Sequence, residues 1–365
     1  MRIEIFVVSL LVIYVNSCGQ TATKVGGPQA PKQVCAGQLI FEDNFDSLNL
    51  NKWQHEVTLG GGGNWEFQYY QKDPKNSYTQ NGILHIKPTL LSDEKGEVFL
   101  TSGKIDIPKD QCTNSDNWGC SRQGTPENVL NPIKSARLHT VNSFTFTYGK
   151  VEVRAKIPAG DWLWPAIWMM PKDFKYSSWP ASGEIDIMES RGNRDLKENG
   201  RNIGTQLMGS TLHFGPNPAN NAFMHTHWEK SLPQGFDRDF HNYQVNWNPN
   251  GITFSVDNQV IGEVKPTNEG FWKVGDLAKS NLPNPWKGSS KMAPFDQQFY
   301  LILNLAVGGT NFFPDNASNP GGKAWSNTSP HSATDFWRGK NQWLPTWKND
   351  GSSHLQVDYV KVWAI

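Results

Sequence analysis

The sequence predicts an all-β protein, built as a sandwich of antiparallel sheets. Glycine and proline, which are typical of turns, number 33 and 23 among 365 residues, as expected for a chain of many short strands. Several segments alternate apolar and polar residues with a period of two, as half-buried strands do. No amphipathic helical pattern competes with them.

The alternation is clearest in three segments, residues 150–157, 251–257 and 355–365. Each places its apolar side chains on one face, so each is predicted to cover a core with that face. We expect the first strand signal, residues 39–45, and the last, residues 355–363, to meet in one sheet.

The amino-acid composition limits which classes of molecule the protein is expected to bind. Lys plus Arg and Asp plus Glu both number 34, so no excess positive charge is available to bind a nucleic acid. Hydrophobic residues make up 37% of the chain, enough for a sizeable core. The 16 tryptophans either pack in that core or stack against a ligand.

The N-terminus resembles a secretory signal peptide, residues 1–17, with cleavage near Ser17. The apolar run at residues 5–15 is shorter than the roughly 20 residues of a membrane span, and a buried strand is the alternative. No other stretch is long and apolar enough to span a bilayer. We therefore expect a secreted, extracellular, soluble monomer.

Four cysteines agree with export, because disulfides form in oxidising compartments. Cys112 and Cys120 enclose a polar loop and are predicted to pair, which leaves Cys18 for Cys35 by elimination. The alternative, a lipid anchor on Cys18, would leave Cys35 without a partner. The spacings do not fit a zinc site.

Residues 18–35 are predicted to be a lead-in segment and residues 36–365 a single domain, since no linker or repeat divides them. Two sequons, at Asn316 and Asn327, permit glycosylation in a eukaryotic secretory host. His225 and His227 form an isolated HxH pattern, which we interpret as surface loop; we expect no metal site.

Three acids, Glu184, Asp186 and Glu189, lie within one strand-like segment, SGEIDIMESRGN. Glu184 and Asp186 share a face, whereas Glu189 is out of phase with them. A β-bulge near Met188 would bring it back, and bulges recur beside active sites. The segment therefore predicts a bulge if it is catalytic; the alternative is an exposed strand with an acidic face.

Two carboxylates facing one cleft are what glycoside hydrolysis requires, with a separation of about 5–5.5 Å in a retaining enzyme. Asp186 would tune Glu184 and help to keep Glu189 protonated. Just upstream, Trp162, Trp164 and Trp168 stand at even spacing, followed by Trp179. Such rings either stack on sugars or belong to the core.

The segments SGEIDIMESRGN and GDWLWPAIWMMP resemble glycoside hydrolase family 16, in its invertebrate branch of β-1,3-glucanases and β-1,3-glucan-binding proteins. The likeness extends over nearly the whole mature chain. Further matching stretches are residues 37–70, 131–140, 210–216, 299–309 and 357–363. The resemblance implies a β-jelly roll of two curved antiparallel sheets with an open cleft on the concave face.

The resemblance also implies roles for individual residues. Glu184 would be the nucleophile, Asp186 the assisting carboxylate and Glu189 the acid/base. The substrate-binding residues implied by the family are Trp164, Trp168, Asn64, Arg137 and His213. A structural histidine is the alternative for His213, and a flexible glycine turn is the alternative for the loop of Asn64.

These observations favour an endo-β-1,3-glucanase that retains configuration and needs no cofactor, with β-1,3-glucan as its partner. Many relatives in this branch have lost catalytic acids, whereas all three stand here. The competing hypothesis is a non-hydrolytic pattern-recognition protein that binds β-1,3-glucan in innate immunity. A third interpretation, an enzyme for mixed-linkage glucan or sulfated galactan, fits the motifs less well.

Overall fold

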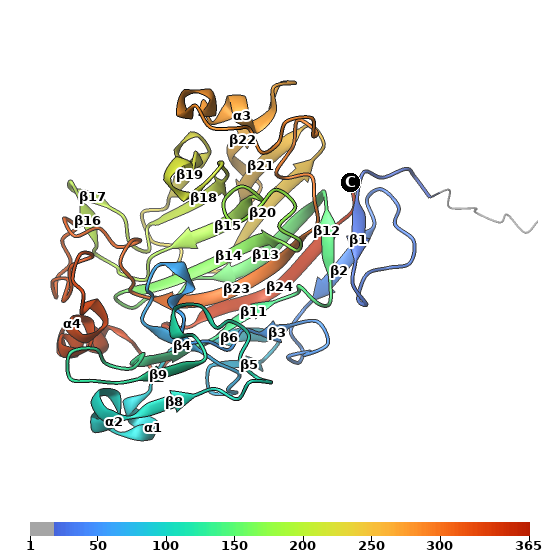
Figure 1. The fold of residues 1–365 in the computed structure, drawn as a ribbon. Coiled ribbons are helices and arrows are strands. Elements are labelled where there is room, and N and C mark those ends of the chain that lie inside the picture. The colour runs from blue at the N-terminus through green and yellow to red at the C-terminus, as the bar shows by residue number, and fades with distance from the viewer. Residues whose placement is uncertain (1–17) are drawn as a thin grey trace, which may run out of the picture.

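Two large antiparallel sheets, packed face to face, dominate the computed structural model of the protein, which describes residues 18–365 (Figure 1). The predicted all-β sandwich is confirmed. The predicted signal peptide, residues 1–17, and its cleavage position lie outside the described residues. Across residues 18–365 no helix combines the length and the apolar character needed to cross a bilayer.

The first sheet has nine strands within the described chain, in the order β1-β12-β23-β14-β15-β18-β19, and β11 joins β23 to β3. Strands β23, β14 and β15 lie side by side at its centre. Its members are β1 (Lys24–Gly26), β3 (Gln54–His55), β11 (Arg137–His139), β12 (Thr145–Thr147), β14 (Leu163–Pro171), β15 (Glu184–Ser190), β18 (Leu207–His213), β19 (His227–Ser231) and β23 (Phe299–Val307).

The second sheet has eight strands in the same part of the chain, in the order β22-β21-β20-β13-β24-β6-β5, with β2 also paired to β24. The pairing of β2 with β24 confirms that residues 39–45 and 355–363 meet. Its members are β2 (Leu39–Asp43), β5 (Ser77–Gln80), β6 (Ile83–Ile86), β13 (Gly149–Lys156), β20 (His241–Asn248), β21 (Gly251–Val256), β22 (Gln259–Val264) and β24 (Leu355–Trp363).

The core lies between these sheets because alternate side chains of each strand turn inward. In β13, buried Val151, Val153 and Ala155 alternate with partly exposed neighbours, as the period of two predicts. Trp247 of β20 packs edge-on against Phe299 of β23, with ring centroids 5.4 Å apart. This contact joins the second sheet to the first.

The lead-in segment, residues 18–35, packs on the first sheet. Its strand β1 pairs with β12, and the hydroxyl of Thr21 donates to the carbonyl of Ile365 (2.6 Å). A disulfide joins Cys18 to Cys35, as elimination predicted. Hydrogen bonds and a covalent closure therefore hold this segment at the end of the sandwich.

Shorter elements form the connections. β4 and β10 pair in parallel, the exception among the antiparallel ladders of the described chain. The short strands are β4 (Gln68–Tyr70), β7 (Thr89–Leu90), β8 (Lys104–Asp106), β9 (Ser121–Gln123), β10 (Ile133–Ser135), β16 (Lys197–Glu198) and β17 (Arg201–Asn202). The α-helices are α1 (Ser92–Lys95), α2 (Glu97–Ser102), α3 (Gly270–Val274), α4 (Ser332–Arg338) and α5 (Lys340–Trp343). The 3-10 helices are η1 (Gly61–Gly63), η2 (Asp116–Trp118), η3 (Pro218–Asn220), η4 (Phe223–His225), η5 (Leu277–Ser280) and η6 (Leu344–Thr346).

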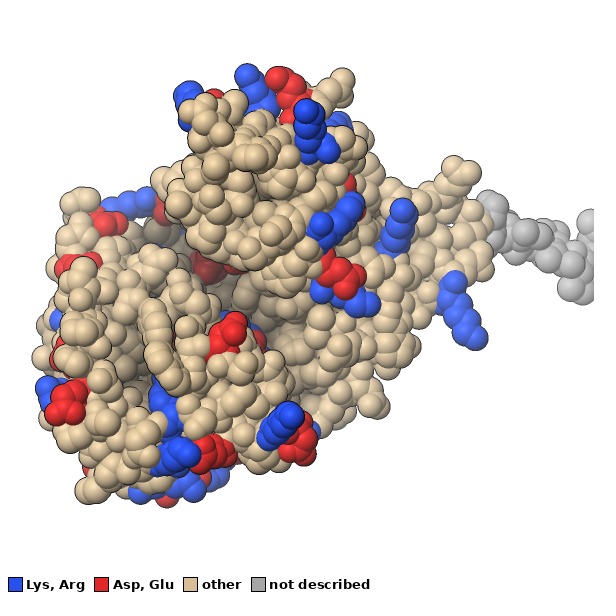
Figure 2. All heavy atoms as spheres, viewed as in Figure 1, with Lys and Arg blue, Asp and Glu red and all other residues tan. Residues whose placement is uncertain are grey.

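Two lobes rise from the sandwich. Helix α3 lies in one of them, near the edge strand β22, and the other contains β8, β9 and α4 (Figure 1). The surface is hollowed between them, and acidic side chains are visible in the hollow (Figure 2). A disulfide joins Cys112 to Cys120 in the connection between β8 and β9, as predicted.

Truncation of Trp247 tests the contact between the sheets. Its ring is fully buried, and its Nε1 donates to the carbonyl oxygen of Phe295 (2.9 Å). We expect Trp247→Ala to lower the free energy of unfolding by about 3–5 kcal/mol, because it leaves a cavity and an unpaired carbonyl. Urea denaturation measures the loss. A change equal to that of the exposed control Val260→Ala would contradict this account.

Candidate active site on strand β15

Strand β15 departs from regular geometry at the point where the sequence predicts a bulge. Asp186 and Glu189 both pair with β18, but Ile187 and Met188 together oppose the single residue Ser210. The bulge near Met188 is therefore confirmed. Ile187 and Met188 are buried in the core, so the extra residue returns Glu189 to the face of the sheet that carries the other two acids.

Two indole N–H groups hold the outer carboxylates. The Nε1 of Trp179 donates to Oε2 of Glu184 over 2.6 Å, and the Nε1 of Trp164 donates to Oε1 of Glu189 over 2.9 Å. Both bonds fix the direction of a carboxylate and leave its second oxygen for another partner. The two glutamates are partly exposed, whereas Asp186 between them is buried.

His213, at the end of β18, supplies positive charge to the cluster. Its Nε2 lies 3.2 Å from Oδ2 of Asp186. Its Nδ1 lies 2.8 Å from the side-chain nitrogen of Asn221, whose Oδ1 has no partner among the described residues. A protonated imidazole donates from both nitrogens, so exchanging the oxygen and nitrogen of the Asn221 amide would satisfy both groups.

The carboxylates and the imidazole shift each other's pKa. Burial raises the pKa of Asp186 well above its ordinary value, and the charge of Glu184 raises it further. Burial also raises the pKa of Glu189, against the opposing charge of His213 and the hydrogen bond from Trp164. For His213, burial alone would lower the pKa, but Glu184, Asp186 and Glu189 raise it to about 10. At neutral pH the imidazole is therefore a cation, and Glu189 is disposed to hold a proton.

Glu184, Asp186 and His213 bring one possible ligand atom each within 4.8 Å of one another. A metal would need the neutral imidazole, however, and His213 carries a proton at neutral pH. Asp186 and His213 thus form an ion pair, with Glu184 close by, more readily than the three residues form a cation site. His227 of the HxH pattern is exposed, and its Nδ1 lies 2.9 Å from the hydroxyl of Thr211.

The evenly spaced tryptophans lie in different environments. Trp162, at a backbone φ of 69°, is buried in the core, where its ring meets Trp325 edge-on. Trp164 stacks on Phe312, with centroids 4.0 Å apart and planes 2° from parallel. Trp168 is partly exposed. The positive φ of Trp162 explains why the alternation does not extend to it.

Arg137 is a buried cation beside Trp168. Its guanidinium lies 5.2 Å from the Trp168 ring and 4.8 Å from the Tyr70 ring, and it donates to Glu56 over 3.1 Å. The Nε1 of Trp168 donates to Oδ1 of Asn304 (2.6 Å). Arg137 and Trp168, which were each predicted to bind substrate, therefore form one packed unit on the first sheet.

Asn64 follows the glycine loop and is partly exposed. Its side-chain nitrogen donates to Glu66 (3.3 Å), and its Oδ1 accepts from Asn311 (3.2 Å). The loop is ordered by its own contacts, because Glu66 donates its backbone N–H to the carbonyl of Gly61. A side chain at Gly62 would collide with the Glu66 carboxylate. These contacts give the glycine loop a defined conformation in the structure.

Sequence reasoning missed several members of the site. The sequence marks Trp179 as an aromatic residue near the acids, but its role as the donor to Glu184 emerges only from the structure; its position five residues before that acid is the available signal. Phe312, Asn304 and Asn221 come from segments distant from β15 in sequence, and no local pattern marks them.

Comparison with known proteins gives consistent findings. Residues 107–290 match the family description "Glycosyl hydrolases family 16". The "Beta-1,3-glucan-binding protein" of Penaeus monodon is 47% identical and spans 98% of this chain and 97% of its own length. The "Beta-1,3-glucan-binding protein 1" of Galleria mellonella is 35% identical over 92% of this chain and 65% of its own length.

Solved structures share the architecture. The laminarinase from Rhodothermus marinus is 26% identical, with a TM-score of 0.55 over 90% of this chain and 98% of its own. The endo-β-1,3-glucanase from Pyrococcus furiosus is 26% identical, with a TM-score of 0.55 over 90% and 95%. The chain is thus similar both to named glucan-binding proteins and to named glucanases, and its fold is the jelly roll that the resemblance implied.

Replacement of His213 tests the charge balance of the site. Its pKa rises from 6.5 to about 10 on folding, so the folded state binds this proton more tightly than the unfolded state. The resulting stability is fully present below the unfolded-state pKa of about 6.5 and is lost as the pH rises toward 10. We expect His213→Gln to cost about 3 kcal/mol near pH 6 and much less near pH 10.

Thermal unfolding of wild type and His213→Gln across this pH range measures the effect. His225→Gln removes an exposed imidazole and serves as the matched control. A difference between wild type and His213→Gln that stays constant with pH would refute the protonated state of His213.

Proposed function

The chain belongs to glycosyl hydrolase family 16, and from this premise we propose that it is a secreted endo-β-1,3-glucanase. It cleaves internal bonds of laminarin-type glucans with retention of configuration. One observation carries the proposal: the bulge of β15 brings Glu184 and Glu189 to one face, where each is oriented by a tryptophan N–H. Two oriented carboxylates on one face are the requirement of glycoside hydrolysis.

In the first step, an oxygen of Glu184 attacks the anomeric carbon of the sugar. The bond from that carbon to the glycosidic oxygen breaks, and the leaving oxygen takes the proton of Glu189. Burial raises the pKa of Glu189, which favours the protonated form that a general acid needs. The product is a glycosyl ester on Glu184.

In the second step, Glu189 acts as a base. It takes a proton from water, the water oxygen attacks the anomeric carbon, and the ester bond to Glu184 breaks. Two inversions at the same carbon give net retention. The two glutamates supply nucleophile, acid and base, so these steps call for no cofactor. Asp186 lies 3.2 Å from His213 beside them.

The arrangement of aromatic and polar groups supports a glucan as substrate. Trp164 and Trp168 flank the acids on the adjacent strand β14, and sugar rings present C–H faces that pack on such rings. Asn64 is partly exposed and offers a polar contact to hydroxyl groups, whereas Arg137 and His213 already contact protein groups. The names of the similar proteins, which refer to β-1,3-glucan or laminarin, favour the β-1,3 linkage.

Secretion is supported by the two disulfides, which persist in oxidising compartments. Of the two sequons, Asn316 is exposed and accessible to glycosylation. The side-chain nitrogen of Asn327 donates to the carbonyl of Phe313 (2.9 Å), and its oxygen accepts from Lys323. We therefore propose Asn316 as the preferred site of glycan attachment.

A second candidate function is the recognition of β-1,3-glucan without hydrolysis, as a pattern-recognition protein of innate immunity. The names of the relatives from P. monodon and G. mellonella favour it. The fold and the aromatic cleft would serve it equally well. The complete set of oriented carboxylates, however, has a purpose only in the enzyme.

Chemical rescue distinguishes the two glutamates. On an activated aryl β-glucoside, we expect azide to restore turnover of Glu184→Ala as an α-glycosyl azide, because azide replaces the lost nucleophile. Azide should restore Glu189→Ala as the β-glycosyl azide, because it attacks the ester intermediate. On laminarin, Glu184→Ala should lose all detectable activity, and Glu189→Ala should lose about 10²–10⁴-fold in kcat.

Release of reducing sugar and NMR of the azide products measure these outcomes. Glu229→Gln, which alters an exposed acid on β19, is the matched control and should hydrolyse laminarin as the wild type does. Wild-type activity that survives in Glu184→Ala would overturn the assignment of the nucleophile. Wild-type binding of laminarin without hydrolysis would replace the enzyme with the second candidate.

A further inference from the structure

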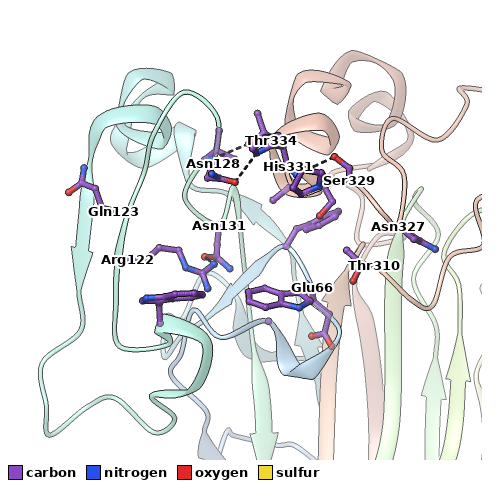
Figure 3. A pocket seen from close by; sticks show the side chains of 18 of the residues that line it. Glu66, Arg122, Gln123, Asn128, Asn131, Thr310, Asn327, Ser329, His331 and Thr334 are labelled. Atoms are coloured by element: carbon purple, nitrogen blue, oxygen red, sulfur yellow. Dashed lines mark hydrogen bonds between the residues drawn. The ribbon is translucent and has the colours of Figure 1, made fainter. Parts of the chain in front are cut away.

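A second cavity of about 930 Å³ lies beside the glycine loop, and none of the catalytic acids lines it. It is enclosed by the β8–β9 connection, the loop from Gly61 to Phe67 and the segment leading into α4. In Figure 3, Arg122 and Gln123 border one side, Glu66 and Thr310 the other, and Asn128 and His331 lie above. This volume is at the upper end of the range for small-ligand sites.

Two exposed tryptophans line this cavity from separate loops. Trp65 is 48% exposed and Trp118 is 70% exposed, and their ring centroids are 6.4 Å apart. Both have a left-handed backbone, with φ of 51° and 60°, which costs free energy for a bulky residue. Two strained, solvent-exposed indoles facing one cavity indicate a ligand that stacks on aromatic rings.

The loop that carries Trp118 is fixed in place. The disulfide between Cys112 and Cys120 closes it, and the backbone N–H of Leu59 donates to the carbonyl of Gly119 (2.8 Å). The hydroxyl of Thr58 donates to the carbonyl of Asn114 (2.8 Å). The indole is therefore held against the glycine loop before any ligand arrives, which lowers the entropic cost of binding.

The charged residues of the lining already have hydrogen-bond or ion-pair partners within the protein. Lys104 pairs with Asp106 at 2.8 Å, and Arg122 donates to Oδ1 of Asn131 and to the carbonyl of Asn117, each over 2.7 Å. The Glu66 carboxylate accepts from Asn64 and Gln68, and burial raises its pKa. Because these polar atoms are engaged within the protein, the cavity favours a ligand held by stacking and by neutral polar groups rather than by an ion pair.

The remaining polar groups of the lining are hydroxyls, amides and an imidazole. They are Ser121, Gln123, Asn128, Ser329 and His331. Because these groups include both donors and acceptors, they can donate hydrogen bonds to the hydroxyls of a ligand and accept hydrogen bonds from them. An uncharged molecule with flat apolar faces and many hydroxyls meets both requirements, and a sugar chain is of this kind.

We propose that this cavity is a second, non-catalytic binding site for a β-glucan chain, seated on Trp65 and Trp118. The inference rests on the proposed function for the choice of glucan. The two sites share one segment, since Thr310 lines the cavity and Phe312 stacks on Trp164, the donor to Glu189. A polymer held in the cavity is thus kept close to the acids that cleave it.

Laminarin binding by the full protein carrying Glu184→Gln tests the proposal, because this change allows binding to be measured without cleavage. We expect Trp118→Ala, added to this background, to weaken laminarin binding about tenfold in calorimetry, equivalent to about 1.4 kcal/mol. Trp118→Phe should recover most of the affinity, because a ring remains. Val260→Ala removes an exposed apolar side chain from β22 and should bind as the parent does.

Oxidative footprinting gives a second readout that needs no substitution in the cavity. We expect laminarin to protect both Trp65 and Trp118 from oxidation. Unchanged affinity in Trp118→Ala, or oxidation of both rings at the same rate with laminarin, would overturn the second site. If the wild type hydrolyses laminarin in that case, only this inference falls; if it neither binds nor hydrolyses laminarin, the proposed function falls as well.

Discussion

Two acids five residues apart can share one face of a strand only if the strand departs from its period of two. In β15 the bulge at Ile187 and Met188 makes that departure, and the strands on both sides adjust to it. The extra residue lies at the centre of the sheet, between strands β14 and β18. Backbone hydrogen bonds to both strands therefore fix the altered register. The position of Glu189 relative to Glu184 is therefore a property of the whole sheet.

Placing several carboxylates together in a partly buried cleft costs electrostatic free energy. The neighbouring side chains offset this cost in two different ways. The His213 cation lies beside Asp186, and the indoles of Trp164 and Trp179 each donate to one glutamate. The charge relieves the centre of the cluster, whereas the neutral donors orient its ends. Burial keeps the pKa of Glu189 raised in spite of these neighbours, as an acid catalyst requires.

The sequence was sufficient to predict whatever depends on local periodicity or spacing. It predicted the strands that cover the core, the pairing of β2 with β24 and the bulge in β15, because each follows from which face a side chain must occupy. It could not predict Phe312 beneath Trp164, or Asn221 beside His213, because these contacts depend on how loops return to the sheet. It also could not predict that Trp162 leaves the alternation, since a positive φ is set by tertiary packing.

The division between sheet and loops has a physical reason. Catalysis needs the two carboxylates held within fractions of an ångström, and a central strand provides that rigidity. Stacking on sugar faces tolerates larger displacements, so loops suffice for Trp65 and Trp118, one of them closed by the disulfide between Cys112 and Cys120. Variation in the loop of Trp118 can therefore change how a polymer is held while the bulged strand, which performs the chemistry, stays the same.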